Sequence, residues 1–322
     1  MDDPGAPEAF PPTIDELEGI EDYEVQLESL NQWQIAWRRF KRHRLAVIGS
    51  FLFLGMCVIA IIGPIVLPYN FLDIKRPDQL VFTGRPPSWI SGDWSPVLLM
   101  GETARFQRDV FTLVINGARL SLVIGIGSTA ISVIVGALWG GIAGYFGGIL
   151  DSVMMRIVDS LLSLPILFLI LVASRFLGQG SWIGVLLIFG LFGWLGISRL
   201  VRSLFLSLRE EQFVDAARAV GVSDWRIIVR HILPNALSPI IVSATLGVAG
   251  VIVSEAFVSF LGFGVDVNTP TWGNILSNSL EFVNQGNWWW AFFPGLAIVI
   301  TVLGINFMGD GLRDALDPRS RA

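Results

Sequence analysis

Charged side chains are scarce in this chain of 322 residues. Only 15% of the residues are Asp, Glu, Lys or Arg, against about 25% in soluble globular domains, and 53% are apolar. The first 30 residues hold ten acids and no base, whereas the rest of the chain carries 17 acids and 22 bases. The composition therefore predicts an acidic tail on a basic, very apolar body, which argues against a soluble enzyme.

The residue types that usually carry cofactors or chemistry are also nearly absent. A single cysteine, Cys57, excludes an internal disulfide and a cysteine cluster for zinc or iron–sulfur. The two histidines, His43 and His231, lie among arginines and lack metal-ligand spacing. No G-x-x-x-x-G-K-[ST] loop and no nucleophile motif occurs, so we expect no catalytic residue, no metal and no cofactor in this chain. The first apolar run begins only at Leu45 and is too long for the core of a cleavable signal peptide.

Long uncharged runs dominate the rest of the sequence. Five of the six exceed the ~18–20 residues that a helix needs to cross a ~30 Å hydrocarbon core. The third reaches that length if it extends back through Asp159 to Ile157, and the fifth continues to Phe263. The runs are continuous and do not alternate with polar residues, so the sequence predicts an all-α membrane protein with six transmembrane helices. The runs are 45–72, 120–150, 160–174, 176–198, 232–254 and 282–309.

The basic residues predict the orientation of these spans. With the N-terminus inside, the inner segments hold 15 Lys and Arg residues and the outer segments hold 7. The positive-inside rule therefore places both termini in the cytoplasm. Trp288, Trp289 and Trp290 open the last span at its outer end, where we expect an interfacial aromatic belt.

The segments around the spans divide the chain further. Thr13 and Glu16 form a capping box, after which an amphipathic helix ends in a basic cluster. We expect this helix in the inner membrane interface, with Trp and Phe toward lipid and Arg at the headgroups, although a solvated helix remains an alternative. The predicted parts are a disordered acidic tail (1–12), the amphipathic helix and basic cluster (13–44), the first span (45–69), an extracytoplasmic loop (70–118), a core with the other five spans (119–310) and a cytoplasmic C-terminal tail (311–322).

Two connectors have patterns of their own. On the outer side, the turn at 269–274 predicts a short helix that dips back toward the membrane. On the inner side, within the loop 199–235, Glu210–Val220 is helical in composition and is followed by Gly221, a good residue to end a helix. Ser223 is suited to cap a second helix that Pro234 closes. Trp225, Ile228, Val229 and Ile232 form an apolar face of that helix. Arg226 and Arg230 form a basic face.

The apolar face of this inner loop must pack against something. It either packs on its own bundle or docks in a groove of a cytoplasmic partner, and we favour docking. Asp224 lies in the first turn of the second helix, where the helix dipole favours a carboxylate.

The same loop carries a resemblance to a known family. The loop resembles the EAA loop of binding-protein-dependent ABC importers. Its pattern is Asp215-Ala216-Ala217, then Gly221, nine further residues, and His231-Ile232-Leu233-Pro234, with Asp215 in place of Glu and His231 in place of Ile. Collinear stretches are similar to the dipeptide/oligopeptide/nickel branch. They are Arg42–Ala46, Arg108–Phe111, Gly117–Leu122, Ser254–Ala256, Ser259–Gly262, Trp272-Gly273 and Gly309–Pro318.

The resemblance implies a C-type permease subunit with the type I ABC importer permease fold. It implies a related second permease, two P-loop ATPase subunits that hold ATP and Mg, an extracytoplasmic solute-binding protein, membrane lipid and no nucleic acid as partners. The location implied is a prokaryotic plasma membrane, or the inner membrane of a Gram-negative cell. The implied solute is a peptide, with nickel chelates or oligosaccharides as alternatives. The residues implied to couple to the ATPases are Asp215, Ala216, Ala217, Gly221, Ser223, Asp224, Arg226 and Pro234.

One acid, Glu255, lies about two-thirds along the fifth predicted span. A carboxylate that faces lipid near the bilayer centre costs ~2.5 kcal/mol or more, so we expect it to face the bundle interior or a water-filled path. It is either a helix-packing group or a pathway or gate residue, and the sequence leaves both open.

Two other classes compete with the importer subunit. A secondary transporter predicts internal repeats and several buried ionisable residues, yet no clear repeat is visible and only Asp159 and Glu255 qualify. An intramembrane enzyme lacks any nucleophile–base pair.

Overall fold

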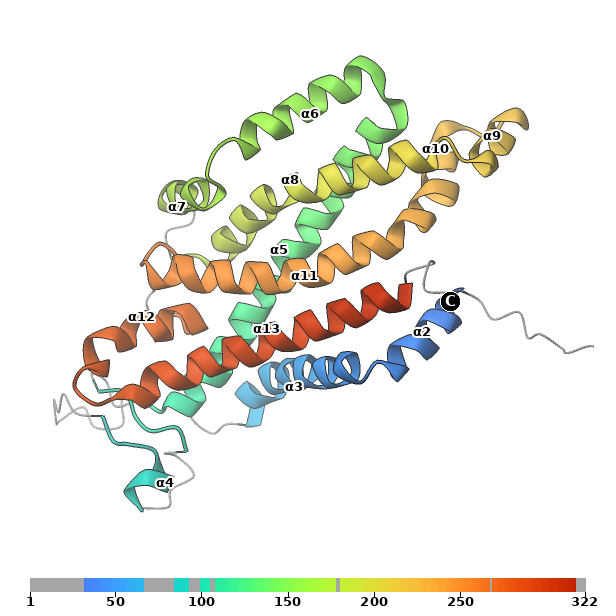
Figure 1. Ribbon diagram of the computed structural model, residues 1–322. Coiled ribbons are helices and arrows are strands. Elements are labelled where there is room, and N and C mark those ends of the chain that lie inside the picture. The colour runs from blue at the N-terminus through green and yellow to red at the C-terminus, as the bar shows by residue number, and fades with distance from the viewer. Residues whose placement is uncertain are drawn as a thin grey trace, which may run out of the picture.

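The computed structural model describes residues 32–66, 84–92, 99–104, 108–177, 180–266 and 268–316. These ranges are helical and irregular, apart from isolated bridges that join Glu102 to Asp109 and Gly180 to Val265. The helices lie side by side in an elongated bundle (Figure 1). They are α2 (Gln32–Arg42), α3 (Arg44–Val66), α4 (Ser88–Ser91), α5 (Val110–Phe146), α6 (Gly148–Leu162), α7 (Ile166–Leu177), α8 (Trp182–Leu208), α9 (Gln212–Ala219), α10 (Asp224–Ile227), the π-helical turn η2 (Ile228–Ile232), α11 (Leu233–Phe260), α12 (Trp272–Val283) and α13 (Trp288–Leu316).

Five helical runs in the described residues are long and apolar enough to cross a membrane: α3, α5, α8, the run Asp224–Phe260 and α13. Helices α6 and α7 meet at an angle of 82° and give a sixth span if the pair crosses as one. The all-α class is confirmed, and the count of six stands on this bent pair. The third span, expected to reach spanning length by extending back to Ile157, is not one continuous helix but is broken between α6 and α7. Pro165 precedes α7, and a proline disfavours helical geometry in the residue before it.

Several predicted boundaries shift because a helix continues beyond the apolar run that it contains. Helix α5 begins at Val110, not near 119, and Asp109 caps it by accepting a hydrogen bond of 3.0 Å from the Thr112 backbone N–H. Helix α8 runs to Leu208, so the connector predicted as 199–235 shrinks to 209–232, and α13 continues to Leu316, into the predicted tail. The predicted tail 1–12 and residues 13–31 lie outside the described residues, as do residues 70–83 of the predicted outer loop.

Helices α5 and α8 pack at the centre of the bundle through three glycines four residues apart, Gly136, Gly140 and Gly144. A Cβ added at Gly144 would lie 2.7 Å from the Arg202 carbonyl oxygen, and one added at Gly140 would overlap the Ser198 carbonyl. Such small-xxx-small spacing lets two helix backbones approach closely in a membrane, where association depends on packing and hydrogen bonds.

Serine side chains add hydrogen bonds between the same two helices. The Ser128 hydroxyl donates to the Leu186 carbonyl at 2.8 Å, and the Ser132 hydroxyl donates to the Gly190 carbonyl at 3.1 Å. Because apolar helices gain little hydrophobic energy from each other in lipid, these bonds and the close backbone contact hold α5 against α8.

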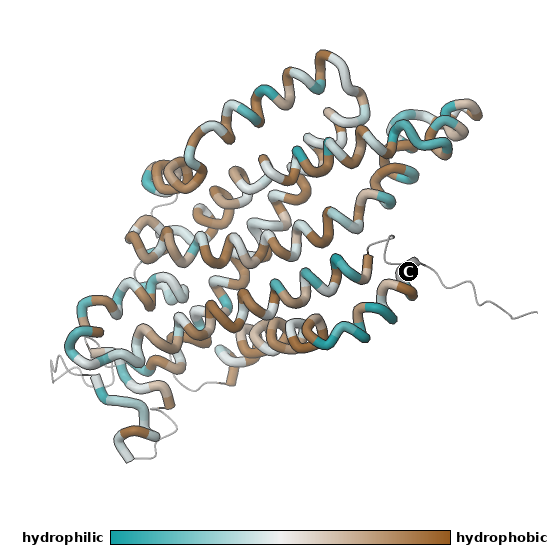
Figure 2. The backbone as a smooth tube through the Cα atoms, in the orientation of Figure 1, coloured by the Kyte–Doolittle hydropathy of each residue, from teal (hydrophilic) through white to brown (hydrophobic). Residues whose placement is uncertain are grey.

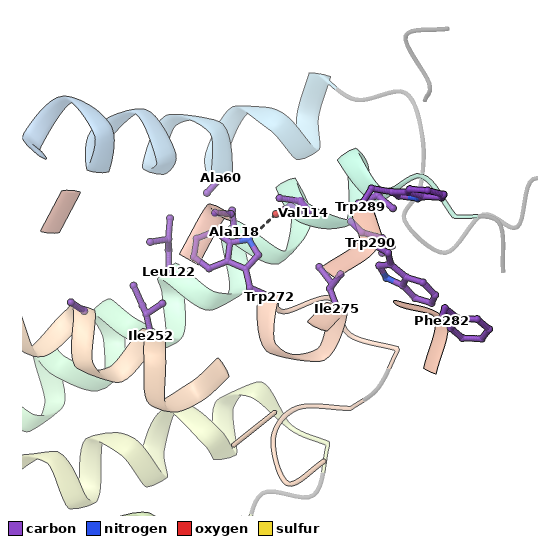
Figure 3. Packing of buried hydrophobic residues seen from close by; sticks show 14 of the residues in the cluster. Ala60, Val114, Ala118, Leu122, Ile252, Trp272, Ile275, Phe282, Trp289 and Trp290 are labelled. Atoms are coloured by element: carbon purple, nitrogen blue, oxygen red, sulfur yellow. Dashed lines mark hydrogen bonds between the residues drawn. The ribbon is translucent and has the colours of Figure 1, made fainter. Parts of the chain in front are cut away.

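The short helix α12 folds back onto the bundle, as the turn at 269–274 predicts. The Thr271 hydroxyl caps it by accepting from the Asn274 backbone N–H at 3.2 Å. Trp272 is fully buried, and its indole Nε1–H donates to the Val114 carbonyl at 3.0 Å, as Figure 3 shows. This tryptophan fixes α12 between α5 and α11.

The three tryptophans that open α13 do not form the expected belt. Trp288 is 41% exposed, but Trp289 and Trp290 are buried. The Trp289 indole donates to the Glu102 carbonyl at 3.1 Å, and Trp290 stacks on Phe282 with ring centroids 5.3 Å apart (Figure 3). Only Trp288 therefore fits the interfacial role, and the other two anchor neighbouring segments.

Helix α2 packs against the C-terminal end of α13. Ala36 and Phe40 are buried in a cluster with Ala46 and Ala315, and the His43 imidazole lies 3.6 Å from a carboxylate oxygen of Asp314. The expectation that Phe40 faces lipid is wrong, because its ring is covered by this cluster. The end of the bundle that holds α2 is rich in polar residues, whereas the middles of the helices are apolar (Figure 2).

Candidate functional site

The connector 209–232 holds the two short helices that the sequence predicts. Helix α9, then Gly221, then α10 project from one end of the bundle, the end that also holds α2 and the last turns of α13 (Figure 1). We call this the α9 end, and the opposite end, with α4 and α12, the α12 end. The helix–Gly–helix arrangement is present in the structure.

Gly221 ends α9 in the left-handed conformation, with φ +79°. The Gly221 N–H donates to the Arg218 carbonyl at 3.0 Å, and the Val222 N–H donates to the Ala217 carbonyl at 3.1 Å. These two bonds form a Schellman motif, which glycine accommodates without strain from a side chain. The turn therefore sets the direction in which α10 leaves α9.

A tyrosine at the end of α5 ties this connector to the bundle. The Tyr145 hydroxyl donates to Asp224 at 2.5 Å, and the Arg218 guanidinium carbon lies 5.8 Å from the centroid of the Tyr145 ring. Arg209 donates to the Gly144 carbonyl at 3.2 Å, at the C-terminal end of α5. The sequence pattern indicates Asp224, but no local pattern indicates Tyr145, which is one of three tyrosines in the chain.

The connector divides its apolar residues between the bundle and the surface. Val214, Ala217, Ile227 and Ile232 are buried in one cluster with Tyr145, Val201 and Phe205. The predicted apolar face is therefore partly wrong, since Ile227 packs inward while Trp225 does not. Four large apolar side chains of the connector stay substantially exposed: Phe213 (38%), Val220 (79%), Trp225 (66%) and Val229 (42%).

Pro234 does not close the second helix, contrary to the prediction. It lies in the first turn of α11, and α10, η2 and α11 form one helical run from Asp224 to Phe260. The Leu233 N–H donates to the Ile228 carbonyl five residues back. This wider π turn lets the helix continue into a proline, whose ring otherwise meets the carbonyl four residues before it.

The remaining predicted coupling residues lie on the exposed side of the connector. Asp215 and Ala216 are exposed on α9, where the Asp215 carboxylate lies 3.4 Å from Arg218. Ser223 precedes α10 without a capping bond from its side chain, and Arg226 is exposed. The arrangement thus combines exposed apolar groups with charges of both signs, which suits a protein contact.

Glu255 faces the bundle interior and is fully buried. It accepts from the Ser259 hydroxyl at 2.7 Å and from the Ser121 hydroxyl at 3.3 Å. Ser121 in turn accepts from the Trp272 backbone N–H at 3.2 Å. The carboxyl group therefore connects α11, α5 and α12, which is the geometry expected of a helix-packing group.

A conservative substitution tests this packing role. We expect Glu255→Gln to keep assembly and transport within about twofold of the unsubstituted protein, because the amide oxygen still accepts a hydrogen bond. Glu255→Leu, which accepts none, should lower the melting temperature by several degrees. Transport and thermal unfolding of the two purified variants provide the check. A large loss of transport in Glu255→Gln with normal assembly would instead assign the charge a role in the path.

No group of three or more His, Cys, Asp or Glu in the described residues is arranged to hold a metal ion.

Comparison with known proteins then identifies the class. Residues 132–322 match the family model described as binding-protein-dependent transport system inner membrane component, and residues 31–82 match the N-terminal TM domain of oligopeptide transport permease C. The chain belongs to the family of inner-membrane components of binding-protein-dependent transport systems.

The individual relatives agree with that family. The dipeptide transport system permease protein DppC of Bacillus subtilis is 37% identical over 92% of this chain and 89% of its own length. DppC of Alkalihalophilus pseudofirmus is 38% identical over 93% and 94%. The oligopeptide transport system permease protein OppC of Haemophilus influenzae is 35% identical over 92% of both chains.

Proposed function

We propose that this chain forms half of the membrane pathway of an ATP-driven peptide importer. The observation that carries the proposal is the full-length similarity to permeases named for dipeptide and oligopeptide transport. Nickel chelates and oligosaccharides remain alternative solutes for the same architecture. A solute-binding protein delivers the peptide, and a related second permease completes the pathway.

The connector 209–232 is where ATP hydrolysis by separate subunits acts on this chain. Phe213, Val220, Trp225 and Val229 expose apolar surface at the α9 end, which a groove in an ATPase subunit would cover. Tyr145 and the buried residues of α9 and α10 hold the connector to the bundle. A displacement of the connector therefore moves the bundle, and rocking against the second permease alternates access.

Uptake by the reconstituted complex tests the proposal. Vesicles that contain both permeases and two ATPase subunits should accumulate a labelled short peptide when ATP and the solute-binding protein are supplied. Nickel chelates and oligosaccharides serve as competing solutes. ATP-dependent uptake of one of these in place of the peptide would refute the peptide assignment.

The topology makes a separate prediction. The 15-to-7 distribution of basic residues supports a cytoplasmic position for the α9 end. In a Cys57→Ala background, a cysteine at exposed Gln285, after α12, should react with an impermeant maleimide on intact cells. A cysteine at exposed Ser223 should react only after the membrane is opened. The reverse pattern would invert the topology.

A further inference from the structure

Two cavities lie along α7 and α11, and residues of α5 and α8 also line the second. The first has a volume of ≈ 690 Å³ and opens at the α12 end, lined by Ser174 and Arg175 of α7, by Gly180 and by residues 261–266 after α11. The second has a volume of ≈ 340 Å³, and Ile170 and Ser254 are among its lining residues. Ser174 follows Ile170 by about one helical turn, and 261 follows Ser254 by about two, so the two cavities lie one after the other along α7 and α11; we call the pair the groove.

The first cavity, which we call the mouth, holds charges of both signs. Arg175 and Asp266 are exposed there, and neither takes part in a salt bridge within the described residues. Two hydrogen bonds hold Asp266: its N–H donates to the Gly180 carbonyl at 3.1 Å, and its carboxylate accepts from the Asn268 N–H at 2.9 Å.

A buried serine adds an unused polar group to the mouth. Ser174 is 2% exposed, and its hydroxyl has no hydrogen-bond partner within the described part of the chain. Leaving a buried hydroxyl unsatisfied costs about 1–3 kcal/mol. A ligand in the mouth that offers a hydrogen bond would recover that loss.

The second cavity, unlike the mouth, has an uncharged lining. Its α11 side carries Ser243, Gly247, Gly250 and Ser254, and its α7 side carries Leu167 and Ile170. None of the residues that line this second cavity is charged. The charged side chains that could bind a charged solute in this groove therefore lie only in the mouth.

These observations fit a zwitterion. A guanidinium binds a carboxylate through paired hydrogen bonds, and a carboxylate on a fixed loop suits an ammonium. We infer that the mouth binds the two charged ends of a short peptide, with Arg175 on the α-carboxylate, Asp266 on the α-ammonium and Ser174 on a backbone amide. This inference rests on the proposed function, since it concerns the solute of that pathway.

Binding without the solute-binding protein tests the inference. The purified complex of both permeases and the ATPases is titrated with trialanine, trialanine amide and N-acetyl-trialanine. The unsubstituted complex should prefer trialanine over each blocked peptide roughly tenfold or more, because each block removes one charge-assisted contact. Arg175→Gln should abolish the preference for trialanine over trialanine amide. Asp266→Asn, which keeps an oxygen for the Asn268 N–H, should abolish the preference for trialanine over N-acetyl-trialanine.

Two control variants separate peptide recognition from misfolding and from the general loss of a positive charge. Arg156→Gln removes an exposed arginine of α6 that lines neither cavity, and it should bind all three peptides as the unsubstituted complex does. Arg175→Lys keeps the charge and should keep most of the preference, which separates recognition from misfolding.

The possible failures are distinguishable. No preference in the unsubstituted complex, or a loss in Arg175→Gln that is equal for all three peptides, overturns the inference. The same holds if the variants weaken only the association with the solute-binding protein. If the full system also imports trialanine with ATP, the proposed function survives. If it imports none, the proposed function fails and the inference fails with it.

Discussion

Replacing Gly140 by leucine is expected to prevent this chain from accumulating as a folded protein. The Cβ position of Gly140 overlaps the Ser198 carbonyl and lies 2.9 Å from the Arg202 backbone nitrogen. Both neighbours are backbone atoms of α8, so no side-chain rotation makes room. Overpacking costs about 1–3 kcal/mol where side chains adjust and more where backbones must separate. The measurement is the amount of monodisperse protein extracted from membranes, which should fall at least fivefold.

A second glycine in a span provides the matched control. Gly55 lies in α3, and an added Cβ there would meet nothing within 4 Å. Gly55→Leu should therefore accumulate normally, although it adds the same side chain to a membrane helix. Equal accumulation of the two variants would contradict the close α5–α8 packing.

Replacing Gly221 by valine is expected to leave the chain in the membrane but to reduce ATP-driven uptake at least tenfold. An added Cβ at Gly221 would also meet nothing within 4 Å, so the effect comes from the backbone and not from a clash. The left-handed conformation costs about 1–2 kcal/mol for an ordinary L-residue, and a β-branched residue tolerates it worst. The valine variant should redirect α10 and weaken the contact with the ATPase subunits.

An asparagine at position 221 tests whether the left-handed backbone conformation, and not the glycine itself, is what uptake requires. It enters the left-handed region more readily than other residues with a side chain, so Gly221→Asn should keep most of the uptake. Uptake and co-purification of the ATPase subunits are measured for both variants. Normal values of both for Gly221→Val would argue against docking through this connector.

The sequence predicts the elements that depend on local patterns. Apolar runs give five of the spans, and the helical composition of Glu210–Val220 followed by Gly221 gives the helix–Gly–helix connector. The turn before Trp272 gives α12. Each of these features is set by neighbours within a few residues, which a single sequence displays directly.

Features that depend on partners distant in the chain are not visible in the sequence. Tyr145 meets Asp224 across 79 positions, and Ser121 meets Glu255 across 134. Pro234 appeared to end a helix because its local effect is to break one, yet the preceding π turn accommodates it. The break in the third span is not visible in the sequence either, because hydropathy carries no information on the angle between α6 and α7.

The unbroken helical run Asp224–Phe260 has a mechanical consequence. Its 37 residues amount to a rod of about 55 Å, with the connector turn at the α9 end and the Glu255 hydrogen bonds near the other end. If the rod pivots at its middle, a tilt of about 10° displaces each end by about 5 Å in opposite directions. A rigid helix of this length would therefore couple a movement at the α9 end to an opposite movement beside the mouth of the groove.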